Sequence, residues 1–440
     1  MAERIVARLG DLCTIEKGET GIASAVPGEF PLVTTAPARK TSETWQFNAE
    51  AVCIPLVSST GHGKKTLNYV HYQSGKFALG SILAAVIPNN PGQLSAAYIH
   101  RYLQFHKNSK LVSLMKGAAN VSLAVRDIAK VEIELPSIED QNRFVLIYDE
   151  AERFARQLED EYEIQERTIQ SLRSSLLQEA IEGRLSAEWR ATHPFKKGDP
   201  ERDGEALLEA IREEKKKLVA AGKIRKEKPL APIGKGEESF GLPEGWVWTR
   251  LGDVGSFGRG KSKHRPRNDP GLFAGGTIPF VQTGEVSQSK WNSYRIEKAE
   301  RFYNEKGLQQ SKIWPKETLC ITIAANIAET GFLQMDACFP DSVVGFISLT
   351  GNSTPWLIRY FLAAAQDEII KFAPATAQKN INLEIIGDLI FPLPPLAEQA
   401  FIVERVEVLL ARVGELEKEV AARRALTEEL MREVLREAFE

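Results

Sequence analysis

The chain has 440 residues, of which 43% are hydrophobic and 26% charged, as in an ordinary globular protein of about three domains. Its formal net charge of −3 argues against a strongly basic nucleic-acid binder. No apolar run approaches the roughly 20 residues that span a bilayer, and the N-terminus lacks the apolar core of a signal peptide. We therefore expect a cytoplasmic protein with no membrane contact.

Residues 1–136 have the composition of a mixed, strand-rich module. Short apolar runs at 51–57 and 81–87 predict buried strands, and 94–115 predicts a helix or a helix pair. A glycine-containing loop at 59–69 carries Lys64, Lys65, Asn68 and Tyr69. Such a loop places lysines on phosphates and Asn or Tyr on base edges, whereas the same composition also suits a solvated hairpin tip.

Residues 137–182 have the periodicity of a long coiled-coil helix. Apolar or aromatic residues recur at alternating spacings of four and three, interrupted at Gln165. The predicted seam consists of Phe144, Tyr148, Ala151, Ala155, Leu158, Tyr162, Ile169, Leu172 and Leu176.

Residues 183–241 form a charged linker rich in proline and glycine. One helix is predicted from 204 to 221, with its lysines toward the C-terminal end. The basic stretch 215–228 suits a DNA backbone contact, but charge runs of this kind are usually solvated helix faces.

Residues 242–394 form a second module. Its segment 255–262, GSFGRGKS, matches the phosphate-binding pattern G-x-x-x-x-G-K-[ST]. That pattern must open a helix, and Pro266 and Pro270 prevent a regular helix there, so we reject nucleotide binding. What remains is a basic loop that we interpret as a nucleic-acid contact. It carries Arg259, Lys261, Lys263, His264, Arg265 and Arg267.

Residues 395–440 repeat the coiled-coil seam. Adding 258 to the first seam gives the second, except that Ile169 aligns with the polar Thr427, and Gln165 aligns with Arg423. The second seam consists of Ile402, Val406, Leu409, Val413, Leu416, Val420, Leu430 and Val434. The modules repeat as well, since the R-L-G-D segment at 8–11 recurs at 250–253. The chain is therefore two copies of one unit, and such a duplication predicts a pseudo-twofold arrangement.

Charge is distributed unevenly over these segments. The first module carries about +4 and the linker about +3, whereas the first helix carries about −7 and the last helix about −4. The positive modules allow phosphate contact, although the net charge does not demand it.

Catalytic and metal-binding patterns are absent from the sequence. There is no amino-methyltransferase N-P-P-[YF], no H-E-x-x-H and no G-x-S-x-G, and the six histidines lack ligand spacing. The four cysteines form no C-x-x-C pair and are predicted to be buried thiols. We expect no catalytic residue, no metal and no cofactor in this chain.

The order of these segments resembles the specificity (S) subunit of type I restriction-modification systems, the HsdS family. The resemblance covers essentially the whole chain and rests on four short motifs in order. These are LPSIEDQ at 135–141, QEAIEGRL at 178–185, LPEGW at 242–246 and LPPLAEQ at 393–399. The first module lacks the L-P-x-G-W opening.

This resemblance implies an α+β fold with two similar strand-rich target recognition domains, joined by two long antiparallel coiled-coil helices. The implied division is target recognition domain 1 at 1–136, a central conserved helix at 137–182, a linker at 183–241, target recognition domain 2 at 242–394 and a C-terminal conserved helix at 395–440. A helix of about 40 residues is about 60 Å long, so the pair could act as a ruler between two half-sites.

The resemblance also implies a function. Each recognition domain reads one half of a split, asymmetric sequence in double-stranded DNA, and the helices dock two methyltransferase (M) subunits and then restriction (R) subunits. S-adenosylmethionine and ATP would belong to those partners. Loop context selects the candidate DNA-binding residues: Lys64, Lys65, Asn68 and Tyr69 in the first module, and Arg259, Lys261, Lys263, Arg265, Arg267, Gln378, Lys379 and Asn380 in the second.

Two alternatives fit the same sequence. A two-headed coiled-coil scaffold that never contacts DNA would suit the overall acidic balance and the seams. A specificity protein of a methylation-only defence system would differ in its partners and share the fold.

Overall fold

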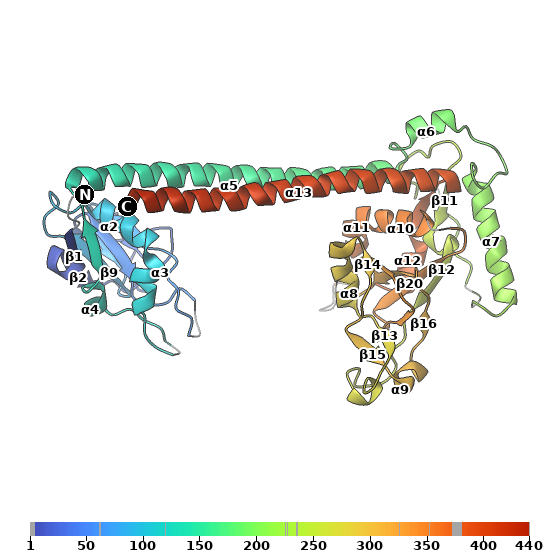
Figure 1. Cartoon of the computed structure of the whole chain (residues 1–440), viewed down its shortest axis with the longest axis horizontal. Helices are drawn as coiled ribbons and strands as arrows, with labels where there is room; N and C mark the ends of the chain where they lie inside the picture. The colour runs from blue at the N-terminus through green and yellow to red at the C-terminus, as the bar shows by residue number, and fades with distance from the viewer. Residues whose placement is uncertain are drawn as a thin grey trace. The chain divides into compact units, whose positions relative to one another are not determined.

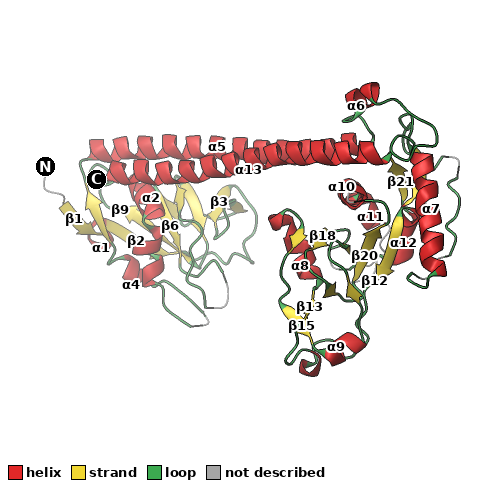
Figure 2. Cartoon of the chain, turned by 45° about the vertical axis from the view of Figure 1, so that its right-hand side comes forward, coloured by secondary structure: helices red, strands yellow, loops and turns green. Residues whose placement is uncertain are grey.

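The computed structural model describes the chain in nine stretches and forms two compact units (Figures 1 and 2). The described residues are 5–60, 63–118, 120–224, 226, 228–234, 236–324, 326–351, 353–371 and 381–439. Unit 1 comprises Met1–Ile164 and Val420–Glu440, and unit 2 comprises Gln165–Glu419. Each unit therefore contains one strand-rich module and a part of each long helix.

Unit 1 builds its module from three small sheets. The N-terminal strand β1 (Ile5–Arg8) pairs with β10 (Glu132–Leu135), the strand that leads into the first long helix. A second sheet has the order β2 (Cys13–Lys17), β9 (Leu83–Pro88), β6 (Ala51–Pro55) and β7 (His71–Gln73). A third has the order β4 (Lys40–Ser42), β3 (Phe30–Val33), β8 (Lys76–Leu79) and β5 (Phe47–Asn48).

Unit 2 repeats these three sheets. Strand β11 (Val247–Arg250) pairs with β21 (Ile390–Leu393). The second sheet has the order β12 (Gly255–Arg259), β20 (Val343–Ser348), β17 (Leu319–Thr322), β18 (Thr330–Leu333) and β14 (Arg295–Ile296). The third has the order β15 (Arg301–Tyr303), β13 (Ile278–Phe280), β19 (Ala337–Cys338) and β16 (Ile313–Trp314).

Pairing directions agree strand by strand between the units. In the third sheet, β3 is parallel to β8 and antiparallel to β4, as β13 is parallel to β19 and antiparallel to β15. Strand β14 is an addition in unit 2, where it pairs in parallel with β18. The offset between the copies drifts from 242 residues at β12 to 260 at β20, and the segment that carries β14 lies between these two strands. The predicted internal repeat is confirmed.

Short helices complete both modules. In unit 1 they are α1 (Leu9–Leu12), α2 (Ala96–Phe105), α3 (Lys107–Lys110), η1 (Val112–Leu114) and α4 (Val125–Ile128). In unit 2 they are η2 (Leu251–Asp253), η3 (Pro270–Leu272), α8 (Thr283–Gln288), η4 (Ser289–Asn292), α9 (Glu305–Gln309), α10 (Ser353–Ala364), α11 (Gln366–Lys371) and α12 (Leu383–Asp388). Helices α2, α3 and η1 confirm the helical prediction for residues 94–115.

The two predicted long helices are confirmed as α5 (Ile138–Ile181) and α13 (Leu396–Phe439). In unit 2, Ile181 shares a core cluster with Ile402, and Arg173 forms an ion pair with Glu417 at 2.9 Å. Because the lower number on one helix meets the higher on the other, the two segments are antiparallel (Figure 1). None of the described helices is long and apolar enough to cross a membrane.

The predicted seams are buried only in part. Tyr162, Ile169, Val413 and Val420 are buried as expected from a coiled coil. Five other seam residues are exposed, which corrects the prediction: Leu158, Leu172, Leu416, Leu430 and Val434 are 36–61% exposed. A pair of helices covers only the residues that point directly at the partner, so an apolar stripe wider than this contact stays open to solvent.

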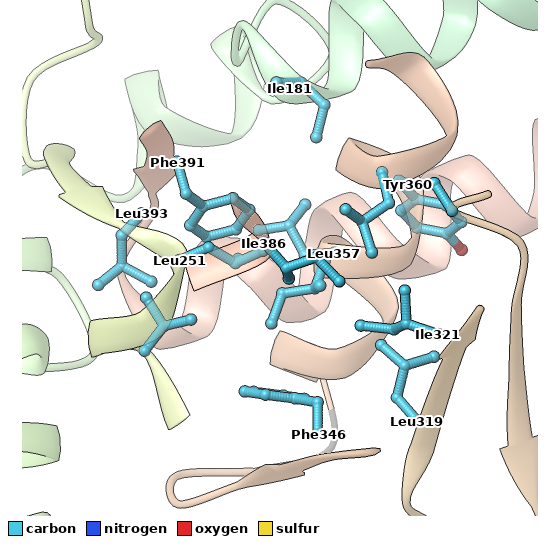
Figure 3. Packing of buried hydrophobic residues seen from close by; sticks show 14 of the residues in the cluster. Ile181, Leu251, Leu319, Ile321, Phe346, Leu357, Tyr360, Ile386, Phe391 and Leu393 are labelled. Carbon is cyan, nitrogen blue, oxygen red and sulfur yellow. The ribbon is translucent and has the colours of Figure 1, made fainter. Parts of the chain in front are cut away.

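Side chains at the C-terminal end of α5 pack into the hydrophobic core of the unit 2 module. Figure 3 shows Ile181 near Leu251, Ile386 and Phe391, all of which are at most 4% exposed. Fully burying side chains of this size stabilises by about 2 kcal/mol each. The helix is therefore part of the folding core of the module.

The glutamine of each L-P-x-x-x-x-Q motif ties a long helix to its module. Gln141 is fully buried, accepts a hydrogen bond from the Ser95 backbone N–H at 2.9 Å, and donates to the carbonyls of Gln93 and Pro136. Gln399 is also fully buried, accepts from Thr354 Oγ1 at 2.7 Å, and donates to the Pro394 carbonyl. Both glutamines thereby lock the start of α5 or α13 against the start of α2 or α10.

We expect Gln141→Ala to lower the free energy of unfolding of unit 1 by about 1–3 kcal/mol, because the Ser95 N–H and two carbonyls lose a buried partner. Urea unfolding of the full chain measures this. Gln93→Ala is the control, because the Gln93 side chain is exposed and only its carbonyl contacts Gln141. Equal unfolding midpoints for both variants would contradict the proposed lock.

The linker folds onto unit 2. It contains α6 (Ala187–Thr192) and α7 (Gly204–Ala220), and α7 confirms the helix predicted from 204 to 221. Asp203 caps α7 by accepting from the backbone N–H groups of Glu205 and Ala206. Leu207, Leu208 and Ile211 on one face of α7 belong to the core cluster of unit 2. The linker is thus a packed part of unit 2.

Two smaller predictions are also confirmed. All four cysteines are free and buried. The first five residues of the phosphate-binding pattern form strand β12, and no helix starts within 260–269. The helix that a phosphate-binding loop must open is therefore missing, as predicted.

Candidate nucleic-acid interface

An open depression in unit 1 gathers most of the predicted DNA-binding residues of the first module. It has a volume of about 370 Å³. Its lining consists of Lys65, Thr66, Leu67, Asn68, Tyr69, Lys107 and Asn108. Lysine, asparagine and tyrosine side chains on one open surface provide donors for phosphate oxygens and donor–acceptor groups for base edges.

Hydrogen bonds within the loop fix this depression. The Thr66 N–H donates to Ser58 Oγ at 3.2 Å, the Thr60 N–H donates to Thr66 Oγ1 at 3.1 Å, and the Asn68 N–H donates to Ser59 Oγ at 2.9 Å. A loop closed by its own Ser and Thr side chains holds its neighbouring side chains in defined positions. The described part of the loop is therefore held by its own hydrogen bonds.

Lys107 and Asn108 belong to the depression although no pattern in the sequence singled them out. Lys107 Nζ donates to the Asn68 carbonyl at 2.9 Å, which joins the start of α3 to the loop. Partial burial lowers the pKa of Lys107. The only signal in the sequence was a cationic residue within a predicted helical segment.

Tyr69 stands at the edge of the depression, with 42% of its surface exposed. Its ring stacks on His71 with centroids 6.0 Å apart. Lys64 is exposed, and its backbone carbonyl accepts from Ser58 Oγ. All four candidates of the first module therefore lie on one loop, with Lys64 outside the depression.

Asp341 binds two arginines of the basic loop of unit 2. Arg259 Nε donates to the Asp341 carbonyl, and Arg267 forms an ion pair with the Asp341 carboxylate at 2.6 Å. Arg265 donates to the carbonyls of Ser262 and His264. The three arginines thus also shape the loop, a role that the sequence did not indicate.

Lys261 and Lys263 differ from the arginines of this loop, because the contacts of Lys261 come from its backbone. The Lys261 backbone is anchored on both sides, since its N–H donates to the Phe339 carbonyl and its own carbonyl accepts from Ser311 Oγ. Lys263 is exposed, and among the described residues its side chain has no ion-pair partner.

Asp269 closes the far side of the same loop. Its carboxylate binds His264 at 2.7 Å, and accepting hydrogen bonds from the Gly271 N–H and from His264 lowers the pKa of the Asp269 carboxyl. The remaining candidates of the second module, Gln378, Lys379 and Asn380, lie outside the described residues.

The candidate interface consists of polar and cationic side chains. Among the described residues, no group of three or more His, Cys, Asp and Glu side chains is placed to hold a metal ion. The described part of the unit 1 loop presents ammonium, amide and phenol groups around an open depression, and the basic loop of unit 2 presents ammonium and guanidinium groups.

Comparison with protein families gives one match over most of the chain. Residues 3–165 and 243–423 match the family described as the type I restriction modification DNA specificity domain. The two matched segments correspond to the two copies of the repeat, each with most of one long helix.

Several curated Escherichia coli proteins are similar to this chain. The specificity subunit of type I restriction enzyme EcoAI is 34% identical over 176 residues, which cover 39% of this chain and 27% of the relative. The EcoEI specificity subunit is 25% identical over 55% of this chain and 40% of the relative. These two alignments thus span well under half of each relative's length. The EcoDI specificity subunit is 23% identical over 98% of this chain and 86% of the relative.

Solved structures share the fold. An HsdS subunit from Thermoanaerobacter tengcongensis aligns over 100% of this chain and 97% of its own length, with a TM-score of 0.50 and 17% identity. A chain from a structure of type I R-M system assembly and conformational transition aligns over 100% and 98%, with a TM-score of 0.61 and 16% identity. The predicted α+β fold with two similar modules and long helices is confirmed.

Proposed function

This chain belongs to the type I restriction modification DNA specificity domain family, and we propose that it is the DNA-binding specificity subunit of a type I restriction-modification complex. Each recognition domain then reads one half of a split, asymmetric target in double-stranded DNA. The observation that carries this proposal is the repeated module, whose three sheets have matching strand order while the loops differ in sequence. Equal scaffolds with unequal loops suit two different half-sites.

We propose that the depression of unit 1 and the basic loop of unit 2 contact the DNA. Lys64, Lys65 and Lys107 would neutralise phosphates, and Asn68 and Tyr69 would reach base edges. In unit 2, Lys261 and Lys263 would act through their ammonium groups, whereas Arg259, Arg265 and Arg267 would present the N–H groups that the loop contacts leave unused. Gln378, Lys379 and Asn380 stay candidates from sequence alone.

The long helices are the proposed docking site for two methyltransferase subunits, with restriction subunits added in the full complex. Exposed apolar side chains on both helices support this proposal: Leu146, Phe154, Leu158 and Leu172 on α5, and Val408, Leu416, Leu426 and Leu430 on α13 are 39–71% exposed. Apolar stripes of this kind on otherwise charged helices suit helix partners. The seam leucines that the intramolecular pair leaves open are among them.

Catalysis is proposed to lie in the partners. The chain would supply specificity, and S-adenosylmethionine and ATP would bind to the methyltransferase and restriction subunits. The proposal includes the five segments predicted from the sequence, with boundaries after residues 136, 182, 241 and 394. It also places the protein in the cytoplasm.

Mapping of methylated adenines tests the proposed function. The chain is co-expressed with an adenine methyltransferase of a type I system from the same host, and host DNA is sequenced at single-molecule level with and without the gene for this chain. We expect a split, asymmetric motif that disappears on deletion. Methylation that persists without the gene, or failure to form a complex, would favour the scaffold that does not bind DNA.

The double variant Lys65→Ala, Lys107→Ala tests the depression of unit 1. We expect about tenfold weaker binding to a target duplex and a salt dependence of the binding constant that is shallower by about two units, since two phosphate contacts are lost. Fluorescence anisotropy of the complex at several salt concentrations measures both quantities.

The matched control is Lys130→Ala with Lys316→Ala, which removes the same charge from exposed side chains remote in sequence from both loops. If this control weakened binding as much as the test variant, the effect would be one of net charge and the depression would have no special role.

A further inference from the structure

The R-L-G-D segment has the same backbone setting in both units. The Leu9 N–H donates to the Val131 carbonyl at 2.9 Å, and the Leu251 N–H donates to the Leu389 carbonyl at 2.8 Å. Both leucines are fully buried. The groups around these leucines, however, have different surroundings in the two units.

In unit 2 the linker covers the arginine and the glycine of this segment. Arg250 is 9% exposed, and its guanidinium donates to the Ala231 carbonyl at 2.7 Å and pairs with Glu237 at 3.3 Å. Lys215 of α7 donates to the Gly252 carbonyl at 2.6 Å. The linker thus provides a carboxylate for the Arg250 guanidinium and an ammonium group for the Gly252 carbonyl.

The linker also covers the flanking residues. Arg212 of α7 lies 3.6 Å from the Asp253 carboxylate. Phe240 packs edge-on against Trp248 of β11, with ring centroids 4.8 Å apart. Helix α7, through Arg212 and Lys215, and the strap after it, through Glu237 and Phe240, thus contact the segment at four places.

Unit 1 presents the same groups uncovered. The Arg8 side chain is 62% exposed, and its one ion-pair partner among the described residues is Glu132, at 3.9 Å. Gly10 and Asp11 are exposed. Ile5 and Val6, which correspond to Val247 and Trp248, are 62% and 56% exposed. Together, Ile5, Val6, Arg8, Gly10 and Asp11 form the R-L-G-D face of unit 1.

We propose that the R-L-G-D face of unit 1 is a docking site for a segment of the methyltransferase subunit with the chemistry of the linker. That segment is a helix with Arg and Lys three residues apart, as Arg212 and Lys215 are, joined to a strap that offers a carboxylate to Arg8 and an apolar ring to Val6. The inference rests on the proposed function and adds to it a contact outside the long helices.

Two observations favour this occupant. Strand β10 ends at Leu135 and α5 begins at Ile138, so a protein bound along α5 in unit 1 adjoins the strand pair that carries the R-L-G-D face. Leu146, two turns into α5, is 71% exposed, whereas its counterpart in unit 2 is the polar residue Glu404. Exposed apolar residues near the start of the helix in unit 1 suit a protein partner there.

Thiol accessibility in the assembled complex tests the inference. Val6→Cys places one reactive thiol on the face, because the four native cysteines are buried. Its rate of modification by a maleimide is measured for the chain alone and with excess purified methyltransferase. We expect a fall of about tenfold, as for a site about 90% occupied. Val26→Cys, at an exposed position of the same unit outside the face, should keep its rate.

Each outcome is decisive. Failure of the unmodified chain to form a complex would overturn the proposed function, whereas a complex in which the thiol of the Val6→Cys variant keeps its full rate would overturn only this inference. Protection that needs no methyltransferase and grows with the concentration of the chain would assign the face to a second copy instead.

Charge reversal gives an independent readout. Arg8→Glu with Asp11→Lys should weaken assembly by about tenfold, as expected when charge pairs at an interface become repulsive. Both side chains are exposed, so the variant should stay folded, with at most a small decrease of its urea midpoint because Glu132 lies opposite position 8 on β10. Unchanged assembly in a folded variant would contradict the inference.

Discussion

Glu398→Ala is expected to lower the free energy of unfolding of unit 2 by about 3–5 kcal/mol and to release the linker from the module. The Glu398 carboxylate is 1% exposed. It accepts from Trp246 Nε1 at 2.8 Å and from Ser186 Oγ at 2.7 Å, and it pairs with Arg190. Removing it leaves a buried indole N–H, a hydroxyl and a guanidinium without their shared acceptor.

Urea unfolding followed by tryptophan fluorescence measures the stability loss, and limited proteolysis within 183–246 measures release of the linker. The repeat supplies the control, because Asp140 occupies the equivalent position in unit 1. Asp140 is exposed, and among the described residues its carboxylate accepts from Ser137 Oγ alone, at the start of α5. Asp140→Ala should therefore lower the free energy of unfolding by only about 0.5–1 kcal/mol. Equal losses for the two variants would mean that the buried cluster around Glu398 contributes nothing specific.

Acidification from pH 7 to pH 5 is expected to lower the free energy of unfolding of unit 1 by about 3–4 kcal/mol through His71 and His100. Burial, and then the charge of Arg39, lower the pKa of His71 to about 4. Burial and the nearby Arg101 likewise lower the pKa of His100 to about 4, against the opposing effect of its bond to the Val70 carbonyl and of Glu152 and Asp149.

Contacts of the two rings explain why both stay neutral in the folded chain. Arg39 lies 3.2 Å from His71 Nδ1, and Arg101 donates to His100 Nδ1. An arginine N–H can only donate, so each Nδ1 must be an acceptor, and protonation would place a second cation against a guanidinium. The Nε2 atom of His100 donates to the Val70 carbonyl at 2.7 Å, which fixes this tautomer.

The sign of the pH effect follows from these lowered pKa values. In the unfolded chain both histidines titrate near 6.5, so between pH 6.5 and 4 the unfolded state binds more protons than the folded state. The free energy of unfolding is thus constant above about pH 7 and falls as the pH falls toward 4. Urea unfolding at pH 7 and pH 5 measures this loss.

His71→Gln with His100→Gln should flatten the pH dependence of the unfolding free energy. An unfolding free energy of the double variant that still falls as steeply would assign the acid sensitivity to carboxylates elsewhere.

The repeat, the two long helices and the strand-rich modules could all be predicted from the order of the residues. Heptad spacing is a local property, because residues three and four apart lie on one helix face whatever the rest of the chain does. The L-P-x-x-x-x-Q motifs likewise marked the start of each helix, where Gln141 and Gln399 lock α5 and α13 to their modules.

Which residues of these patterns are buried, and which groups meet, depends on the packing of the folded chain. Leu158 and Tyr162 both occupy seam positions, yet only Tyr162 is buried. Burial of a seam residue depends on which side chains of the other helix lie opposite it. Lys107 joins Asn68 across 39 residues, and Arg267 joins Asp341 across 74. Such pairs form only when the tertiary structure brings distant segments together, and local periodicity carries no information on which segments meet.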